Sequence, residues 1–543
     1  MSSEVEKWIA TWLDSASERG YQHAFVTALL LEGHEVLLNT SHNSLELGKD
    51  VIARGPDKKV YAYQLKGNPA GRYSMGDWHS GFQQVQQLVN MPIPSVLVGR
   101  IGLSHVPIVV TNGEVMEDVQ HAVDSFNRLG AVEKPNRNDL TFLTRGQILH
   151  ILYKHSKGIW PADIESEISI LRFLSATGQG ELDIAELSRL IKAMLRWDDK
   201  PSRRALTERV AGSCLVTTIA ISRWIDSGNL YEAVRGLTCL LGILYCFTEK
   251  YGTGLKATVK ILGAIRSFIF SRITELEDFI VGLRTPLLSK NIFAEFAYFH
   301  SRKMLLYGVV AANLLERSRR GEDISLAPAS DIFRGRLEFP FLEGEYVVPS
   351  ALAYFWATEH VSGKRDGDLA LMSMLDTILA VNGQEGAEAN LASPYHGLVD
   401  VARSKYRRWL GFSYHALDRD SAFNSSWFAK SIFYMVARRN WKRHCRTFWP
   451  QLTRMAHKKV VLTDVSEFAF WRSAAAVEST EIIAVPQTWD DVIAHCQRPL
   501  SPAVPGALKD DPVVCLLTCM FLPFRMNDEI VASLDRSFSG AWY

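Results

Sequence analysis

Cysteine is scarce in this sequence, and neither sign of charge is in excess. Seven cysteines are scattered along 543 residues, an odd number that does not make the disulfide framework of a small secreted domain. Sixty Lys and Arg residues against 59 Asp and Glu residues leave a formal net charge of +1. Because no overall basic field would draw the chain to nucleic acid, any such contact must come from a local basic patch.

Long apolar runs are also lacking. The longest, such as residues 237–247, are much shorter than the roughly 18 residues that a membrane helix needs. The first 20 residues carry acids and no apolar run beside basic residues, so we expect no signal peptide. No glycine-rich phosphate-binding loop follows a predicted strand. With an ordinary 47% of apolar residues, these absences favour a soluble, cytoplasmic chain of several folded domains and no membrane segment.

The first 158 residues alternate helix and strand patterns. Apolar residues at helical spacing predict a helix near the start, a second over 21–32 and a third over 77–89. Gly33 ends the second helix, and Gly55–Lys58 is a turn sequence that predicts a hairpin. Strands are predicted at 34–38, 50–53, 60–66, 95–98 and 108–111. We therefore expect residues 1–158 to form an α/β domain whose mixed sheet is flanked by helices.

From about residue 160 the pattern is helical to the end. Long segments repeat the helical period, among them 205–227, 230–251 and 255–283. No fixed-length repeat is clear, so a regular solenoid is not indicated. The sequence predicts a large all-α region, divided into helical domains at 159–320 and 321–543.

The residues that point to chemistry lie on the predicted hairpin. Alternation along the second strand puts Gln64 and Lys66 on one face, and the hairpin brings Asp50 beside them. Asp50 offers an anionic oxygen, Gln64 an amide oxygen and Leu65 a peptide carbonyl, a set that suits Mg²⁺ or Mn²⁺ completed by water. A metal there would activate water beside a phosphate, with Lys66 orienting that water or stabilising the transition state. The pattern therefore favours hydrolysis of a phosphodiester.

These residues resemble a known family. The helix that ends at Gly33, the Gly-Lys-Asp run at 48–50 and the Gln-Leu-Lys run at 64–66 are similar to the PD-(D/E)xK nuclease superfamily, particularly its Mrr-like branch, in which QxK commonly replaces ExK. The Val-Val-Thr-Asn-Gly run at 109–113 is similar to a strand-to-helix turn in many relatives. The resemblance covers about residues 1–155. It implies a restriction-endonuclease-like fold in which Asp50 and Gln64 bind the metal and Lys66 is the catalytic lysine.

The sequence departs from that pattern in one carboxylate. Relatives often carry a glutamate on the helix before the first strand, and that place falls near Gln22 or His23 here. Gln22 would bind a metal more weakly, through its carbonyl oxygen. Glu46, four residues before Asp50, is another replacement for the missing carboxylate. The alternative interpretation is that Gln22 and Glu46 are ordinary surface residues.

The resemblance implies a metal-dependent endonuclease that acts on DNA. Nuclease domains of this kind fused to helical regions are similar to effectors of bacterial anti-phage and restriction systems, where the appended region restrains the nuclease until a partner or ligand is sensed. A protein partner such as an ATPase, for example an SMC-like one, is implied in the same way, and a homo-oligomer is left open. Two alternatives remain: a non-catalytic helical scaffold whose degenerate nuclease fold binds nucleic acid or a protein, and an RNA nuclease using the same site.

A basic and aromatic segment lies in the helical region. Its cations recur at helical spacing: Arg438, Arg439, Lys442, Arg443 and Arg446. Such cations would meet phosphates, and neighbouring tryptophans could stack on bases. The simpler interpretation is a solvated helix face whose aromatic residues turn to the core, or a surface for a partner protein. Nucleic-acid binding at these residues is therefore one hypothesis among three.

Overall fold

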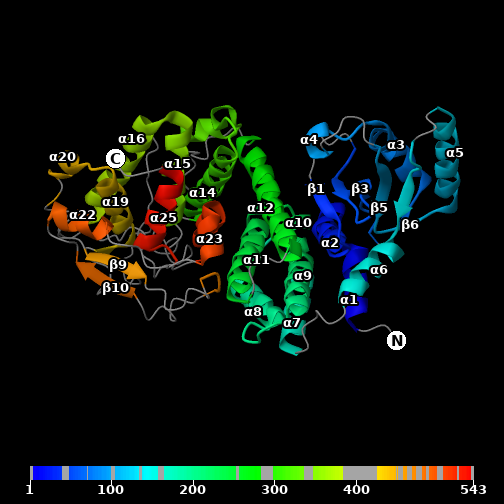
Figure 1. Cartoon of the computed structure of the whole chain (residues 1–543), viewed down its shortest axis with the longest axis horizontal. Helices are drawn as coiled ribbons and strands as arrows, with labels where there is room; N and C mark the ends of the chain where they lie inside the picture. The colour runs from blue at the N-terminus through cyan, green and yellow to red at the C-terminus, as the bar shows by residue number, and fades with distance from the viewer. Residues whose placement is uncertain are drawn as a thin grey trace, which may run out of the picture. The chain divides into compact units, whose positions relative to one another are not determined.

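The computed structural model describes residues 4–39, 48–69, 71–98, 104–133, 137–156, 164–251, 256–282, 298–334, 347–382, 425–447, 449, 456–460, 468–471, 480–484, 488–497, 505–522 and 525–539. Its elements fall into two compact units, Met1–Glu275 and Leu276–Tyr543 (Figure 1). The division lies inside the predicted domain 159–320, and the predicted boundaries near residues 158 and 320 stay predictions.

A five-stranded mixed sheet forms the N-terminal part of the first unit. In sheet order its strands are β1 (Glu35–Asn39), β2 (Val51–Arg54), β3 (Val60–Lys66), β5 (Val106–Thr111) and β7 (Thr141–Leu143). The pairs β1–β2 and β2–β3 are antiparallel, whereas β3–β5 and β5–β7 are parallel. The turn between β2 and β3 is the predicted hairpin, in which the Gly55 N–H donates to the carbonyl of Lys59 (2.9 Å).

Helices flank this sheet as predicted (Figure 1). The helix α2 (Glu18–Leu31) packs on one face, where the ring of Phe25 lies 5.5 Å from that of Tyr63. On the other face, Ala62 shares a buried cluster with Trp78 and Val85 of α3 (Met75–Asn90). Alternate residues of β3 therefore face opposite helices. The remaining elements of this part are α1 (Glu4–Ser15), α4 (Ser95–Val98), α5 (Glu117–Glu133), α6 (Arg145–Ser156) and the small parallel pair β4 (Arg72–Tyr73) and β6 (Glu114–Val115).

One predicted strand is wrong. Residues 95–98 form the single helical turn α4, which begins where the Leu97 N–H donates to the carbonyl of Pro94 (3.0 Å). Leu97 and Val98 are only partly buried, against Ile52 and Ile93. The run of β-branched residues suggested a strand, but proline set a turn just ahead of it.

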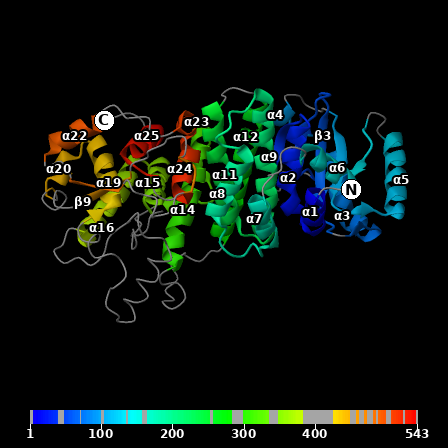
Figure 2. The same ribbon diagram turned by 90° about the horizontal axis from the view of Figure 1, so that it is seen from below.

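The rest of the first unit is helical. It consists of α7 (Ile164–Ser175), α8 (Ile184–Leu195), α9 (Arg203–Ala220), α10 (Ser222–Asp226), α11 (Leu230–Tyr251) and α12 (Lys256–Gly282), whose last residues belong to the second unit. The helices α8, α9 and α11 pack on one another (Figure 2). In the part of the chain that is described, α11 alone is long and apolar enough to cross a membrane. Its apolar window is 78% buried inside the fold, which fits a core helix.

Polar contacts join α1 and α2 to α10 in the first unit. The indole N–H of Trp12 donates to the hydroxyl of Ser222 (2.8 Å), and the Ser17 hydroxyl donates to the Asp226 carboxylate. A Cβ at Gly20 would lie 2.2 Å from an Asp226 oxygen, so a larger residue at position 20 would displace the Asp226 carboxylate from Ser17. Residues 1–156 therefore contact the helices that follow them in the first unit.

Acid should destabilise the contact between α2 and α12 through His23, which lies on α2. The His23 ring is fully buried 4.4 Å from that of Phe268, and neither ring nitrogen has a hydrogen-bond partner among the described residues. Burial, and then the nearby Arg272, lowers the pKa of His23 well below its usual value. Because only the unfolded chain takes up a proton there, the free energy of unfolding should fall as the pH drops below roughly 6.5.

His23→Phe should remove that part of the acid sensitivity, measured as the urea midpoint at a neutral and a mildly acidic pH. The matched control is His121→Phe, because His121 is exposed on α5. Equal loss of stability on acidification in the wild type and in His23→Phe would show that His23 is not the titrating group.

The second unit is mostly helical. Its main helices are α14 (Tyr298–Arg319), α15 (Val347–Ser362), α16 (Lys364–Asn382), α19 (Trp427–Arg438), α20 (Lys442–Cys445), α22 (Trp489–Gln497), α23 (Gly506–Asp510), α24 (Pro512–Phe521) and α25 (Asp528–Ser539), with short 3-10 turns η1 (Ile324–Leu326) and η2 (Ser330–Phe333). The helix α15 packs on α14, α16, α24 and α25. Its residues Phe355 and Trp356 are fully buried, so α15 lies at the centre of this core.

The prediction of an all-α region is wrong in the second unit. A three-stranded sheet occurs there, in the order β10 (Thr480–Ala484), β9 (Ala456–Val460) and β8 (Ser425–Ser426). These strands are two to five residues long, too short to give a clear period of two. The Ala-His-Lys-Lys-Val sequence of β9 also resembles a basic surface segment more than a strand.

Candidate active site

The structure brings Asp50 and Gln64 together at the open end of the β2–β3 hairpin. The backbone ladder ends where the Asp50 N–H donates to the carbonyl of Tyr63 (2.9 Å). Beyond that point the Asp50 carboxylate replaces a strand partner: its Oδ2 accepts from the Leu65 N–H (2.6 Å) and from Gln64 Nε2 (2.7 Å). The Asp50 and Gln64 side chains are both buried. The carboxylate is therefore fixed in place by β3.

The loop before Asp50 explains the glycine of the Gly-Lys-Asp run. Gly48 has φ +74°, and a Cβ there would lie 2.5 Å from the carbonyl oxygen of Gln84 on α3. Only glycine allows the loop to approach α3 this closely. Lys49 is buried beside it and donates to the carbonyl of Gln87 (3.2 Å). Burial lowers the pKa of Lys49 to about 8.

Two protein oxygens face the amide group of Gln64. Its nitrogen lies 2.7 Å from Asp50 Oδ2 and 3.4 Å from the carbonyl oxygen of Leu65. Half a turn of the amide would present its own oxygen in this place. The donor set is thus one carboxylate, one amide and one peptide carbonyl, which fits a hard divalent cation with few protein ligands. Among the described residues, no group of three or more His, Cys, Asp or Glu side chains could hold a metal ion.

Lys66 lies two residues beyond Gln64 on the same face of β3. Its ammonium donates to the side-chain oxygen of Gln84 on α3, and the side chain is only half-buried. The backbone of Lys66 is held by Tyr21, whose hydroxyl donates to its carbonyl (3.0 Å) and accepts from its N–H (3.2 Å). The amine end of Lys66 is therefore accessible on a fixed backbone.

Glu18 is a carboxylate beside this strand end that the sequence analysis missed. A Cβ at Gly67 would lie 2.8 Å from the backbone nitrogen of Glu18, so the first turn of α2 approaches the chain directly after Lys66. The pKa of Tyr21 is raised well above its usual value, by burial, then by the Glu18 carboxylate and less by that of Asp50. Both carboxylates thus act on one hydroxyl. The signal in the sequence was the position of Glu18, one helical turn before Gln22.

The other residues proposed for the site have different surroundings. Gln22 is buried on α2 and donates to the side-chain oxygen of Asn39 (2.8 Å) at the end of β1. Asn39 pairs with Val51, so Gln22 lies beside the strand that follows Asp50. His23 packs against Phe268, away from this strand end. Glu46 lies outside the described residues.

The Thr-Asn-Gly run at 111–113 fixes the chain after Lys66. Asn112 is fully buried, and its amide donates to the carbonyls of Leu13 (2.8 Å) and Ala16 (2.9 Å) while its oxygen accepts from the Asn68 N–H (2.7 Å). The run leads first into β6 and then into α5, not directly into a helix as the resemblance implied. Its structural effect is to tie α1 and the loop after Lys66 to the end of β5.

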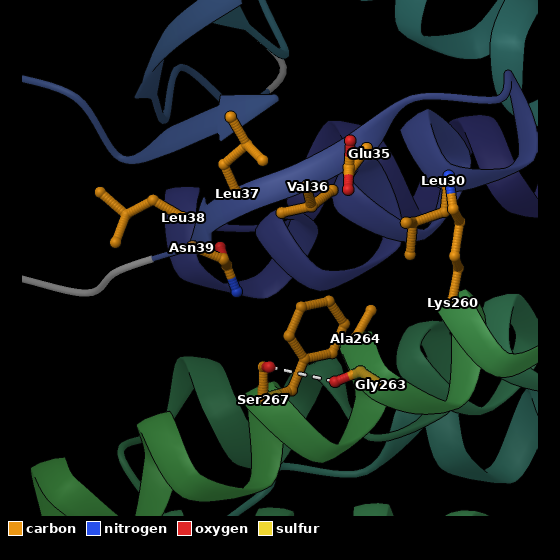
Figure 3. A pocket seen from close by; sticks show the side chains of 11 residues that line it. Leu30, Glu35, Val36, Leu37, Leu38, Asn39, Lys260, Gly263, Ala264 and Ser267 are labelled. Carbon is orange, nitrogen blue, oxygen red and sulfur yellow. Dashed lines mark hydrogen bonds between the residues drawn. The ribbon is translucent and has the colours of Figure 1, made fainter. Parts of the chain in front are cut away.

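A pocket of about 260 Å³ lies in the same unit, between the edge strand β1 and α12 (Figure 3). Glu35 and Lys260 line it, together with apolar side chains of both elements. Glu35 is paired with Arg54 (3.0 Å), and Ser267 donates to the carbonyl of Gly263 within α12 (3.0 Å). The residues that line this pocket therefore add no further catalytic groups to those of the hairpin site.

The basic segment of the second unit is divided between core and surface. Arg438 and Arg439 are buried and bind the Asp535 carboxylate, at 2.5 and 3.3 Å. The helical spacing suggested that these two arginines share an exposed face with the later cations, and this is wrong because Asp535 draws them inside. Lys442, Arg443 and Arg446 are exposed.

Comparison of the chain with models of protein families, with curated proteins and with solved structures found no match. What the chain does must therefore be inferred from its own residues.

Proposed function

We propose that this protein is a metal-dependent endonuclease that hydrolyses phosphodiester bonds in DNA, with Mg²⁺ or Mn²⁺ as cofactor. The observation that carries the proposal is the meeting of Asp50 Oδ2, the Gln64 amide and the Leu65 carbonyl at one point, with Lys66 next on the same face. The PD-(D/E)xK resemblance of residues 1–155 and the mixed sheet support the same function.

Each group at the candidate site has a separate role in the proposed reaction. Asp50, Gln64 and Leu65 would hold the cation, which when bound acidifies water and neutralises charge on the phosphate. Lys66 would hold the attacking water or donate to a phosphate oxygen as charge develops there. Gln84 accepts from Lys66 and would keep its ammonium over α3 until substrate arrives. The Tyr21 hydroxyl fixes the backbone of Lys66 and so the point from which the lysine side chain extends.

The same resemblance supports a biological role. We propose an effector of a bacterial anti-phage or restriction-type system, in which the helical region restrains the nuclease and receives a signal from a protein partner such as an SMC-like ATPase. Cleavage of supercoiled plasmid, with EDTA as control and a single-stranded RNA in parallel, tests the reaction and separates the DNA nuclease from the RNA nuclease. A chain that binds nucleic acid in every condition and cuts none would favour the non-catalytic scaffold.

Asp50→Asn should weaken Mn²⁺ binding by about tenfold or more, because Asp50 is the one anionic ligand in the proposed set. Asparagine keeps the size of the side chain and an oxygen for the Leu65 N–H, so the fold should survive. Isothermal titration calorimetry with MnCl₂ measures the affinity. Asp57→Asn on the hairpin turn is the matched control, since Asp57 accepts from the Lys59 N–H at the surface (3.1 Å). Equal affinity in Asp50→Asn and the wild type would place the metal elsewhere.

A further inference from the structure

A second pocket lies in the second unit, where the turn after α19 meets the start of α22. It encloses about 920 Å³ and is lined by residues 440–444, 446, 449 and 488–490. Sites for small ligands typically occupy roughly 300–1,000 Å³, so this pocket is large enough for a drug-sized or nucleotide-sized molecule.

Three tryptophans line this pocket. The rings of Trp449 and Trp489 lie 5.7 Å apart at an angle of 58°. The ring of Trp441 lies 5.8 Å from that of His444. Trp441 and Trp449 are half-buried, whereas Trp489 is buried. Indole rings that line one pocket are suited to stacking on a flat ring.

Basic residues outnumber acidic residues among those that line the same pocket. Lys442, Arg443 and Arg446 are exposed, and Asp490 is the carboxylate among the lining residues. Lys442 forms an ion pair with Asp490 (3.5 Å), whereas Arg443 and Arg446 make no ion pair within the part of the chain that is described. Two guanidinium groups are therefore available for an anion, and their planar forks match phosphate oxygens.

The backbone that carries these cations is fixed by buried ion pairs at the end of α19. Arg438 and Arg439, at the end of α19, are bound to Asp535 of α25 inside the core. Asn440 then takes φ +51°, which turns the chain sharply, and α20 starts at Lys442. The basic segment thus consists of a buried anchor and an exposed ligand surface that directly follows it.

We propose that this pocket binds a nucleotide, with the base against the tryptophans and the phosphate at Arg443 and Arg446. An aromatic ring joined to a phosphate is the chemistry that this lining complements: a bare phosphate would leave the indoles unused, and an apolar ligand would leave the arginines unused. A free nucleotide and an unpaired nucleotide of a strand share this chemistry. The pocket belongs to the second unit and the hairpin to the first, and the proposal does not depend on nuclease activity.

Binding by the full-length protein should be measured in EDTA, so that metal-dependent cleavage does not enter the result. The probes are ATP, a 5′-phosphorylated oligothymidylate and inorganic tripolyphosphate. The affinity of each is measured by isothermal titration calorimetry. We expect ATP or the oligonucleotide to bind, and tripolyphosphate to bind at least about tenfold more weakly because it cannot stack. Saturable ATP binding assigns the pocket to free nucleotides, and binding of the oligonucleotide alone assigns it to a strand.

The variant Arg443→Ala/Arg446→Ala should weaken binding about tenfold or more, because it removes both phosphate contacts. Lys200→Ala/Arg203→Ala is the matched control, since both residues are exposed in the first unit and should not affect affinity. Trp449→Ala should weaken binding, and Trp449→Phe should restore most of it, an outcome that general loss of structure would not give. Absence of binding by both ATP and the oligonucleotide, equal affinity for tripolyphosphate, or affinity unchanged in the double variant would each overturn the proposal.

Discussion

Lys66→Ala is expected to reduce metal-dependent plasmid cleavage by about 10²-fold or more, the size of effect that loss of one catalytic proton-transfer group or charge-stabilising donor produces. Lys66 is half-buried and its ammonium contacts exposed Gln84, so little packing is lost with it. The fold should therefore be unaffected, with an unchanged thermal midpoint. The measurement is the rate of nicking of supercoiled plasmid in Mg²⁺ or Mn²⁺, with wild type and variant at equal concentration.

Lys59→Ala provides the control on the same hairpin. Lys59 is exposed and lies 3.9 Å from Asp57, so its removal changes the net charge by the same amount without touching the end of β3. Cleavage should be close to that of the wild type. If Lys66→Ala cuts as fast as Lys59→Ala, then Lys66 is not the catalytic lysine and the proposed site is wrong.

A restrained effector would leave plasmid uncut, and the structure indicates which fragment to test in that case. Cutting the chain near residue 158 would strip α2 of α9 and α10 and would break the contact of Trp12 with Ser222. It would also leave Asp226 without its partner Ser17. The fragment 1–275 keeps these contacts and follows the boundary of the compact unit. Cleavage by this fragment and not by the whole chain would assign the restraint to the second unit.

Much of the hairpin site was predictable because it depends on local rules. The period of two in β3 placed Gln64 and Lys66 on one face, and the turn at Gly55–Lys58 set which strand would lie beside them. Glu18 was not recognised because an acid in the first turn of a helix is ordinary chemistry for the helix dipole. Its approach to the end of β3 depends on the path of the chain after Lys66, which no local pattern specifies.

The basic segment shows the opposite case, in which a regular spacing misled. The cations from Arg438 to Arg446 have helical spacing, and spacing alone places them on one solvated face. The acid that divides them, Asp535, lies 97 residues beyond Arg438, on another helix. The helical spacing of the basic segment cannot reveal an ion-pair partner that lies so far along the sequence. The same limit applies to β8–β10, whose short strands are defined by their pairing more than by their own sequences.

Asp535→Ala should destabilise the second unit by about 3–5 kcal/mol, the cost of removing one partner from a buried ion pair, although Arg439 keeps its contact with Glu359 (3.4 Å). Its carboxylate is buried and accepts from Arg438 Nε (2.5 Å), from the guanidinium of Arg439 (3.3 Å) and from the indole N–H of Trp356 (2.9 Å). Removal would leave two guanidinium groups in the core beside the fully buried ring of Trp356. Urea denaturation followed by tryptophan fluorescence should show a transition at lower urea than in the wild type.

Asp490→Ala separates this effect from the loss of a carboxylate as such. Asp490 is exposed and pairs with exposed Lys442 at 3.5 Å, so its removal should cost less than about 1 kcal/mol. The two variants also predict opposite effects on the nucleotide pocket. Asp490→Ala removes the acid that competes for Lys442 and should strengthen nucleotide binding, whereas Asp535→Ala releases the anchor beneath the pocket and should weaken it. Equal urea midpoints in Asp535→Ala and Asp490→Ala would mean that the buried arginines do not depend on Asp535, and that the anchor lies elsewhere.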